Sequence, residues 1–151
     1  MKEDMTANDT QVSGSHYKTT YQPWDFMHDT ELGYFEGNIV KYTQRHKHKA
    51  GAVDLDKAAH YAMKWLELHE QGRKFQNILA RLCNSRVTPS DDYLPGVRKV
   101  HTTITRFVDS NLMGMAEANV ITAVVTARTQ RDGYAVLDQI RELRRQAYPN
   151  G

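Results

Sequence analysis

Lysine, histidine and tyrosine residues recur at helical spacing in the front half of the chain, and these residue types suit the binding of an anion. The clearest run follows the i, i+3, i+4, i+7 spacing of one helix face and consists of Lys57, His60, Tyr61 and Lys64. Lysine offers a compact charge and arginine a bidentate fork, which together match the oxygens of a phosphoryl group. From composition alone a solvated, charged helix face is the preferred interpretation, and a phosphate-binding face is the functional alternative.

The preceding segment carries a second polar stripe, formed by Glu36, Asn38, Lys41 and Arg45. Helices joined by a short turn that contains glycine lie antiparallel, so both stripes are expected to face one cleft. The N-terminus of the second helix would add amide donors and a favourable dipole for phosphate. Asp54, the expected N-cap of that helix, would compete for these donors.

A basic and aromatic segment lies upstream of both stripes and contains His16, Tyr17, Lys18 and Trp24. Such a segment could fold over a bound base, stack on it and exclude water. For Trp24 and Phe26 we prefer a second explanation, in which they anchor the N-terminal segment to the apolar surface of the domain.

Several sharper motifs are absent from the sequence. Residues 14–19 lack the GxxxxGK[ST] spacing of a phosphate loop, and no strand precedes them. The scattered histidines lack metal-ligand spacing, so we predict no metal-binding residues. There is no GxSxG elbow and no catalytic cysteine signature. Mg²⁺ bound beside a phosphate would have to use Glu36, Asp54 and Asp56, without the ExxE-type carboxylate pairs of all-helical nucleotide pyrophosphohydrolases.

The composition fits one ordinary domain. The chain has 151 residues, of which 40% are hydrophobic, and a formal net charge of +2. This small charge makes any basic site local and nucleic acid a less expected partner. The single cysteine, Cys83, excludes an internal disulfide and suits a buried thiol in a reducing cytoplasm. No stretch approaches the ~18 apolar residues of a membrane helix, so we expect a cytoplasmic protein without a membrane partner.

Apolar periodicity predicts an all-α, compact helical domain. The expected apolar lines include Phe35, Ile39, Tyr42 and His46 within residues 34–48, and Leu137, Ile140 and Leu143 in the last helix. The expected helices are a short one from Pro23 to near Gly33, then 34–48, 54–70, 74–84, 97–108, 113–129 and 133–147, where the third and fourth either break at Gly72 or run on as one. Residues 119–126 are rich in β-branched side chains, but we predict helix because no second strand is present to pair with them.

The same pattern divides the chain into three parts. Residues 1–15 are expected to be a flexible or strap-like N-terminal tail that stays mobile until a partner orders it. Residues 16–88 form the helical region with the candidate site. A loop near 89–96 leads to a C-terminal helical region, 89–151, which belongs to the same domain or serves oligomerisation.

One ordered series of residues resembles the signature of a small phage-encoded family, the nucleotide kinases that lack a P-loop. The series runs from His16 to about Glu67 and consists of His16-Tyr17-Lys18, Gln22-Pro23-Trp24-Asp25, Glu36 to Tyr42, Arg45, Lys49, Gly51, Asp54 to Ala58, His60 and Tyr61. The resemblance implies transfer of phosphate from a nucleoside triphosphate to dTMP or dGMP by a homo-oligomeric enzyme. Phosphoryl transfer demands positioning and charge neutralisation, which lysine and arginine can supply without a P-loop.

The resemblance also implies roles for individual residues. Lys18, Lys41, Arg45 and Lys57 would hold phosphates, and Glu36 or His60 would accept a proton. Trp24 or Tyr61 would contact a base, and Asn38 would bind sugar or base. His16, Tyr17 and Lys49 complete the expected nucleotide-binding set.

Other functions fit the same residues. A basic cleft that lacks a convincing catalytic base and a metal site could bind and sequester a nucleotide without catalysing a reaction. A nucleic-acid-binding protein would use residues 41–49 with Arg141, Arg144 and Arg145 as phosphate contacts. Metal-dependent release of pyrophosphate is the weakest option because carboxylates are sparse.

Overall fold

The computed structural model describes residues 6–10, 12, 18–83 and 97–150, and the side chains of these residues except 72–83 and 97–99. This part of the chain forms helices and no strand, which confirms the predicted all-α fold. The α-helices are α1 (Pro23–Asp29), α2 (Tyr34–Arg45), α3 (Ala52–Cys83), α4 (Val97–Ser110), α5 (Met115–Thr126) and α6 (Gln130–Ala147), and two short 3₁₀-helices are η1 (Ala7–Asp9) and η2 (His46–His48).

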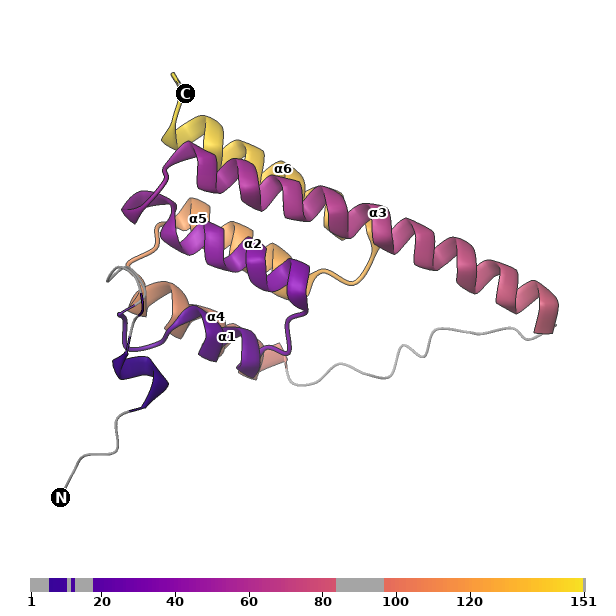
Figure 1. The fold of residues 1–151 in the computed structure, drawn as a ribbon, viewed down its shortest axis with the longest axis horizontal. Helices are drawn as coiled ribbons and strands as arrows, with labels where there is room; N and C mark the ends of the chain where they lie inside the picture. The colour runs from indigo at the N-terminus through magenta and orange to yellow at the C-terminus, as the bar shows by residue number, and fades with distance from the viewer. Residues whose placement is uncertain (1–5, 11, 13–17, 84–96, 151) are drawn as a thin grey trace.

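The α-helices lie in two layers (Figure 1). α1, α2 and α3 lie side by side in chain order, and α4, α5 and α6 lie behind them, so that α1 packs on α4, α2 on α5 and α3 on α6. α2 and α3 run antiparallel, because Arg45 at the end of α2 meets Asp54 at the start of α3, while Tyr34 at the start of α2 meets Tyr61 further along α3. The predicted helix pair is therefore present.

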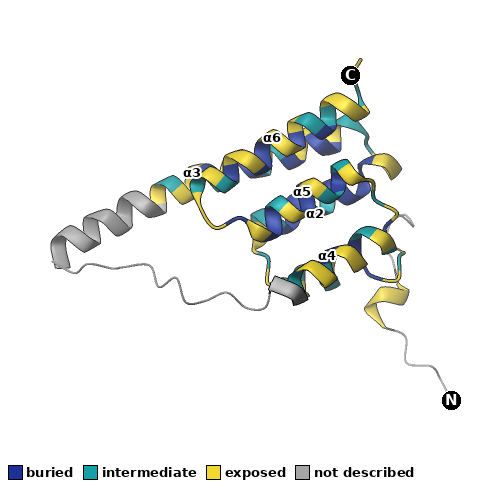
Figure 2. Cartoon of the chain, turned by 180° about the vertical axis from the view of Figure 1, so that it is seen from behind, coloured by how far each residue is buried: buried dark blue, intermediate teal, exposed yellow. Residues whose placement is uncertain are grey.

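One core fills the space between the layers. Phe26 of α1 stacks on Phe107 of α4 with ring centroids 4.2 Å apart, and Tyr21 meets both rings edge-on. Buried residues of the other helices continue the same cluster, including Ile39, Leu55, Ile121 and Ile140. Each helix turns its buried residues inward and leaves the others exposed (Figure 2). The described parts of 16–88 and 89–151 thus share one core.

The turn between α2 and α3 differs from the prediction. α3 begins at Ala52, so Asp54 lies within its first turn, and the prediction of Asp54 as the N-cap is wrong. Gly51 has a φ of +57°, which a residue without a Cβ adopts at little cost, and this reverses the chain just before α3. The helix then continues through Gly72 to Cys83 as one element.

The buried stripes follow the sequence pattern closely in α6 and less closely in α2. In α6 the predicted stripe Leu137, Ile140 and Leu143 is buried. The helix begins before the expected Gly133, because Thr129 and Asp132 cap it with reciprocal hydrogen bonds of 3.2 and 2.8 Å. In α2 the predicted apolar line was wrong in part, since Phe35 and Tyr42 are only half-buried.

The β-branched segment 119–126 is helical within α5, as predicted. Its most apolar side chains, among them Val120 and Ile121, are buried against the neighbouring helices. Tertiary burial on a helical framework therefore overrides the strand propensity of this segment.

The N-terminal segment is a strap in the part that the structure describes, rather than a free tail. Asn8 of η1 binds α1 and the residue before it: its side chain accepts a 2.6 Å hydrogen bond from Trp24 Nε1 and donates one of 2.9 Å to Asp25, and its carbonyl accepts one of 3.0 Å from Gln22. His16, Tyr17, the loop near 89–96 and the side chain of Cys83 lie outside the described residues. None of the described helices is both long and apolar enough to cross a membrane.

Candidate functional site

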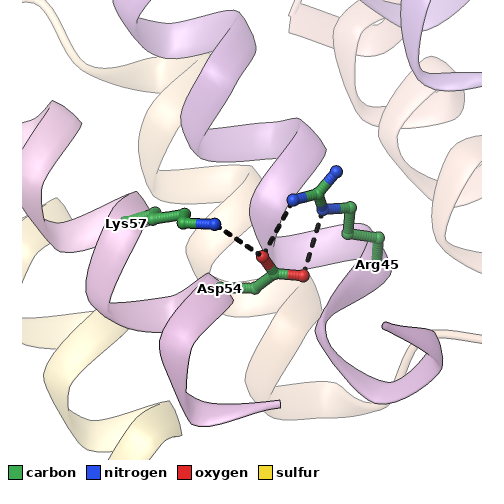
Figure 3. A network of polar contacts seen from close by, with 3 residues as sticks. All are labelled: Arg45, Asp54 and Lys57. Carbon is green, nitrogen blue, oxygen red and sulfur yellow. Dashed lines mark hydrogen bonds and ion pairs between the residues drawn. The ribbon is translucent and has the colours of Figure 1, made fainter. Parts of the chain in front are cut away.

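A buried ion pair joins the end of α2 to the start of α3. Arg45 Nε donates to Asp54 Oδ2 at 3.0 Å and Arg45 Nη2 donates to Asp54 Oδ1 at 2.9 Å (Figure 3). Arg45 is 8% exposed and Asp54 is fully buried. Lys57 approaches the same carboxylate from α3, with Nζ 3.9 Å from Oδ1. The guanidinium group therefore directs its two parallel hydrogen bonds to a protein carboxylate.

This position corrects the expectation that Arg45 belongs to an exposed polar stripe, and its contact with phosphate stays a prediction. A long side chain at the edge of a helix face can turn inward, and the carboxylate in the first turn of α3 compensates its charge there. We therefore assign Arg45 a positioning role in the α2–α3 pair.

Three cationic side chains lie around the ring of Tyr42. The Arg45 guanidinium carbon lies 4.6 Å from the ring centroid, and Lys41 Nζ and Lys57 Nζ each lie 5.6 Å from it. These distances are within the range of cation–π attraction, which is worth about 0.5–1 kcal/mol at exposed sites. Lys57 is 47% exposed, so its charge is available to a ligand from solvent.

Further tyrosines extend this arrangement along the helix pair. Tyr61 of α3 stacks on Tyr42 with centroids 5.7 Å apart, and Tyr34 meets Tyr61 edge-on at 5.9 Å. A hydrogen bond with Tyr61 raises the pKa of Tyr34, and the charge of Lys41 opposes this rise. Lys41 therefore lies near Tyr34 as well as Tyr42. We call the set Tyr34, Lys41, Tyr42, Lys57 and Tyr61 the tyrosine–lysine face.

Only some of the predicted site residues join this face. Lys41, Lys57 and Tyr61 belong to it, and Arg45 contacts it through the ring of Tyr42. Asn38 lies on α2 and its amide donates to Tyr34 O at 2.7 Å, so part of its hydrogen-bonding capacity is used within its own helix. Glu36 is half-buried in the first turn of α2, and His60 is exposed beside Tyr61 on α3.

Other predicted residues lie elsewhere. Trp24 is on α1, which packs on α2 and α4, and its indole is held by Asn8. None of the described ring or cation contacts of the tyrosine–lysine face involves Trp24, whose contact with a base stays a prediction, and Phe26 is a core residue as preferred. Lys18 is exposed near Asp9, whose pKa is lowered chiefly by hydrogen bonds with Thr6 and only slightly by Lys18. Lys49 is exposed in the turn before α3.

The carboxylates considered for Mg²⁺ face different cations. Asp54 binds Arg45, and Asp56 binds Arg144 of α6, with Arg144 Nε 2.5 Å from Oδ1. In the described part of the chain, no three His, Cys, Asp or Glu residues are grouped so that they could hold a metal ion. Any Mg²⁺ at the tyrosine–lysine face would depend on oxygens of the nucleotide itself.

A second buried polar group follows directly on Arg45. His46 is 1% exposed, and its Nε2 lies 3.1 Å from Glu117 Oε1 while its Nδ1 lies 2.9 Å from the Tyr148 hydroxyl. Lys47 also forms an ion pair with Glu117. Hydrogen bonding to His46, followed by the contact with Lys47, lowers the pKa of Glu117 to about 2. This group ties η2 to α5 and to the C-terminal segment.

Comparison with known proteins gives one match. Residues 12–63 of the 151 match a family model described as a protein of unknown function (DUF3310). No curated protein and no solved structure matches the chain. The matched segment contains α1, α2 and the first part of α3, and thus every residue of the tyrosine–lysine face. The second layer, α4 to α6, lies outside it.

Sequence reasoning missed two residues that organise this site. Tyr42 was placed in the apolar line of α2, and Asp54 was treated as a helix cap. Their spacing held a usable signal: Lys41 and Arg45 flank Tyr42 within one turn or less, and Asp54 follows a short turn that returns the chain antiparallel. The pairing of Asp54 with Arg45 required the rotation of each helix, which the spacing did not supply.

Proposed function

We propose that this chain binds a nucleoside phosphate on the tyrosine–lysine face, and that it transfers a phosphoryl group from a nucleoside triphosphate to dTMP or dGMP. The observation that carries the binding proposal is the convergence of Lys41, Arg45 and Lys57 on the ring of Tyr42. Among the described ion pairs around this ring, Asp54 is the one carboxylate. The local excess of positive charge favours an anionic ligand.

The residues of the face and the ion pair beside it have different roles in the proposed binding. Arg45 and Asp54 hold α2 and α3 in register. Lys57 is exposed and Lys41 is half-buried beside it at the Tyr42 ring, and an ammonium group suits phosphate as a point charge. Tyr34 is 68% exposed and offers a flat apolar surface next to these charges. Stacking of a base on such a ring is worth about 1–3 kcal/mol.

The proposed reaction rests on the resemblance to nucleotide kinases that lack a P-loop. Phosphoryl transfer needs an in-line arrangement and neutralised charge on the phosphate oxygens. Lys41 and Lys57 would supply the charge, and Mg²⁺ carried by the nucleotide would supply the rest. Glu36 or His60 would accept the proton of the attacking group. Self-association, which the resemblance also implies, stays a prediction.

The test uses purified full-length protein with dTMP or dGMP and ATP, with and without Mg²⁺. Chromatography follows every nucleotide, and calorimetry measures the binding of each monophosphate. Lys57→Ala removes an exposed charge and Lys41→Ala removes a half-buried one that forms none of the described ion pairs, so both variants should keep the fold by circular dichroism. Lys64→Ala is the matched control: helical spacing places Lys64 on the same helix face, but in the structure this similarly exposed lysine pairs with Glu67 at 2.9 Å and makes none of the described contacts with the Tyr42 ring.

We expect formation of the diphosphate, with a loss of about tenfold or more in affinity or turnover for each of the two variants and little change for Lys64→Ala. Nucleotides recovered unchanged but bound in stoichiometric amount would replace the kinase with a sequestering protein. Absence of binding, or equal loss in the Lys64→Ala control, would contradict the proposed site.

The nucleic-acid alternative gains no support from α6. Arg144 pairs with Asp56 and Arg145 pairs with Glu142, so these arginines already meet protein carboxylates. Strongly salt-dependent binding of DNA without binding of mononucleotides would nevertheless favour it over our proposal.

A further inference from the structure

The imidazole of His46 is held at both nitrogens by groups from distant parts of the chain. Nε2 lies 3.1 Å from the Glu117 carboxylate and Nδ1 lies 2.9 Å from the Tyr148 hydroxyl. A carboxylate only accepts hydrogen bonds, so Nε2 donates to Glu117, and Nδ1 is the atom that shares a hydrogen bond with the Tyr148 hydroxyl. Both partners belong to the second layer or to the segment that follows it, while His46 belongs to the first.

The same groups also fix the backbone between α2 and α3. Lys47 pairs with Glu117, and Gly51 N donates to His46 O at 2.9 Å. The Tyr148 ring lies beside Gly51: a Cβ built on this glycine would be in ordinary van der Waals contact with it, 3.5 Å from Tyr148 Cε1. The turn is therefore held from one side by α5 and from another by the C-terminal segment.

This turn sets the geometry of the tyrosine–lysine face. Arg45 directly precedes His46, and Asp54 follows Gly51 within the first turn of α3. The Arg45–Asp54 pair and the approach of Lys57 to Tyr42 both depend on how the turn brings the two helices together. A displacement of the turn would move Lys57 of α3 away from the Tyr42 ring, around which Lys41 and Arg45 of α2 lie.

We propose that the chain of hydrogen bonds Tyr148–His46–Glu117 is a latch by which the C-terminal segment and α5 hold the tyrosine–lysine face in its binding geometry. His46, Glu117 and Tyr148 are positioning residues in this scheme. Binding at the face then stabilises the latched turn, and loss of the latch weakens binding, because coupling between two sites is reciprocal. The effect on ligand rests on the proposed function, whereas the effect on the turn does not.

The test compares Tyr148→Phe, which removes the hydroxyl and keeps the ring, with Tyr134→Phe, which changes an exposed tyrosine of α6. Hydrogen exchange of residues 46–54 reports the turn, and the ¹⁵N shifts of the His46 ring report its hydrogen bonds. Calorimetry reports the affinity for dTMP and dGMP. Glu117→Gln, which keeps an oxygen that accepts from His46 but removes the charge opposite Lys47, is a second probe if Tyr148→Phe folds poorly.

We expect Tyr148→Phe to speed exchange in residues 46–54 by about 3- to 10-fold, to shift the His46 resonances, and to weaken nucleotide affinity by a similar factor. Tyr134→Phe should change none of these. Unchanged exchange in Tyr148→Phe would overturn the latch, and faster exchange with unchanged affinity would overturn its coupling to the face. If the unmodified protein binds no nucleotide, the proposed function fails, and the exchange data still decide whether the latch exists.

Discussion

Arg45 and Asp54 form a two-point ion pair that is closed to water, between the last residue of α2 and the first turn of α3. Removal of one partner from such a pair leaves an uncompensated buried charge, which typically costs about 3–5 kcal/mol. Replacement of both partners by apolar residues avoids that penalty. Variants of this pair therefore test the stability of the fold, whereas variants of the tyrosine–lysine face test ligand binding.

We expect Arg45→Met to lower the free energy of unfolding by about 3–5 kcal/mol, because Asp54 then lies buried without its partner. The double variant Arg45→Met with Asp54→Leu should recover most of this loss. Urea unfolding followed by circular dichroism measures both. Lys57→Met is the control, since Lys57 is half exposed and 3.9 Å from the carboxylate, and it should cost less than about 1 kcal/mol. An Arg45→Met variant as stable as the unmodified protein would refute the structural role.

Tyr34 provides a test of base stacking that does not disturb the core. Tyr34→Ala should weaken nucleotide binding by about tenfold or more, because the exposed ring is the proposed stacking surface. Tyr34→Phe keeps the ring and loses only the hydroxyl, so its affinity should stay close to that of the unmodified protein. Calorimetry with dTMP and dGMP distinguishes them. Equal losses in the two variants would show that the hydroxyl, rather than the ring, makes the contact.

Glu117 should make the free energy of unfolding depend on pH in the acidic range. Its pKa is near 2 in the folded protein and near 4.5 without these contacts, so the unfolded chain binds the proton more tightly. The stabilisation is complete above about pH 4.5 and is lost as the pH falls toward about 2. Glu117→Gln should be less stable than the unmodified protein at pH 6, and the difference should shrink by pH 3. Unfolding curves at both pH values measure it, with the exposed Glu67→Gln as control; a difference that does not change with pH would contradict the assignment.

Gly133 lies where α6 approaches α3 closely. A Cβ on this residue would lie 2.6 Å from Leu66 Cδ2 and 2.8 Å from Trp65 Cζ3, both on α3. Gly133→Ala should therefore lower stability by about 1–3 kcal/mol, despite the better helix propensity of alanine. Thermal unfolding measures this loss.

Two further variants test whether the steric clash on α3 causes the loss of stability in Gly133→Ala. Adding Leu66→Ala should make the Gly133→Ala change less costly than it is alone, because space is created where the new methyl group points. Gln139→Ala, at an exposed position of the same helix, should have little effect. A stabilising Gly133→Ala would mean that the two helices can move apart without penalty.

The amino-acid sequence by itself determined the helical character of the chain and most helix positions. The stripe Leu137, Ile140 and Leu143 identified the buried face of α6, and the missing partner strand correctly favoured helix for residues 119–126. Capping signals also lay in the sequence, as in Thr129 and Asp132, although the predicted start at Gly133 overlooked them. These features are local: each depends on side chains within one or two turns of the same helix.

The sequence also singled out Lys41, Lys57 and Tyr61, because residue type and helical spacing alone suggest that they share a polar surface. It gave Arg45 the wrong environment. Whether a long side chain at the edge of a helix meets solvent or turns inward depends on the partner opposite, and that partner is Asp54. The expected contact of Trp24 with a base stays a prediction; in the structure α1 packs against α2 and α4, and Asn8 binds the Trp24 indole.

Only the tertiary structure decided which distant residues meet. His46 contacts Glu117 and Tyr148 because α5 and α6 pack behind α2 and α3, and no periodicity within one helix specifies the rotation or offset of one layer on another. Those two variables are set by the combined packing of side chains from both layers. The sequence therefore determined the helices and their chemical faces, and the packing of the layers determined how those faces combine into a site.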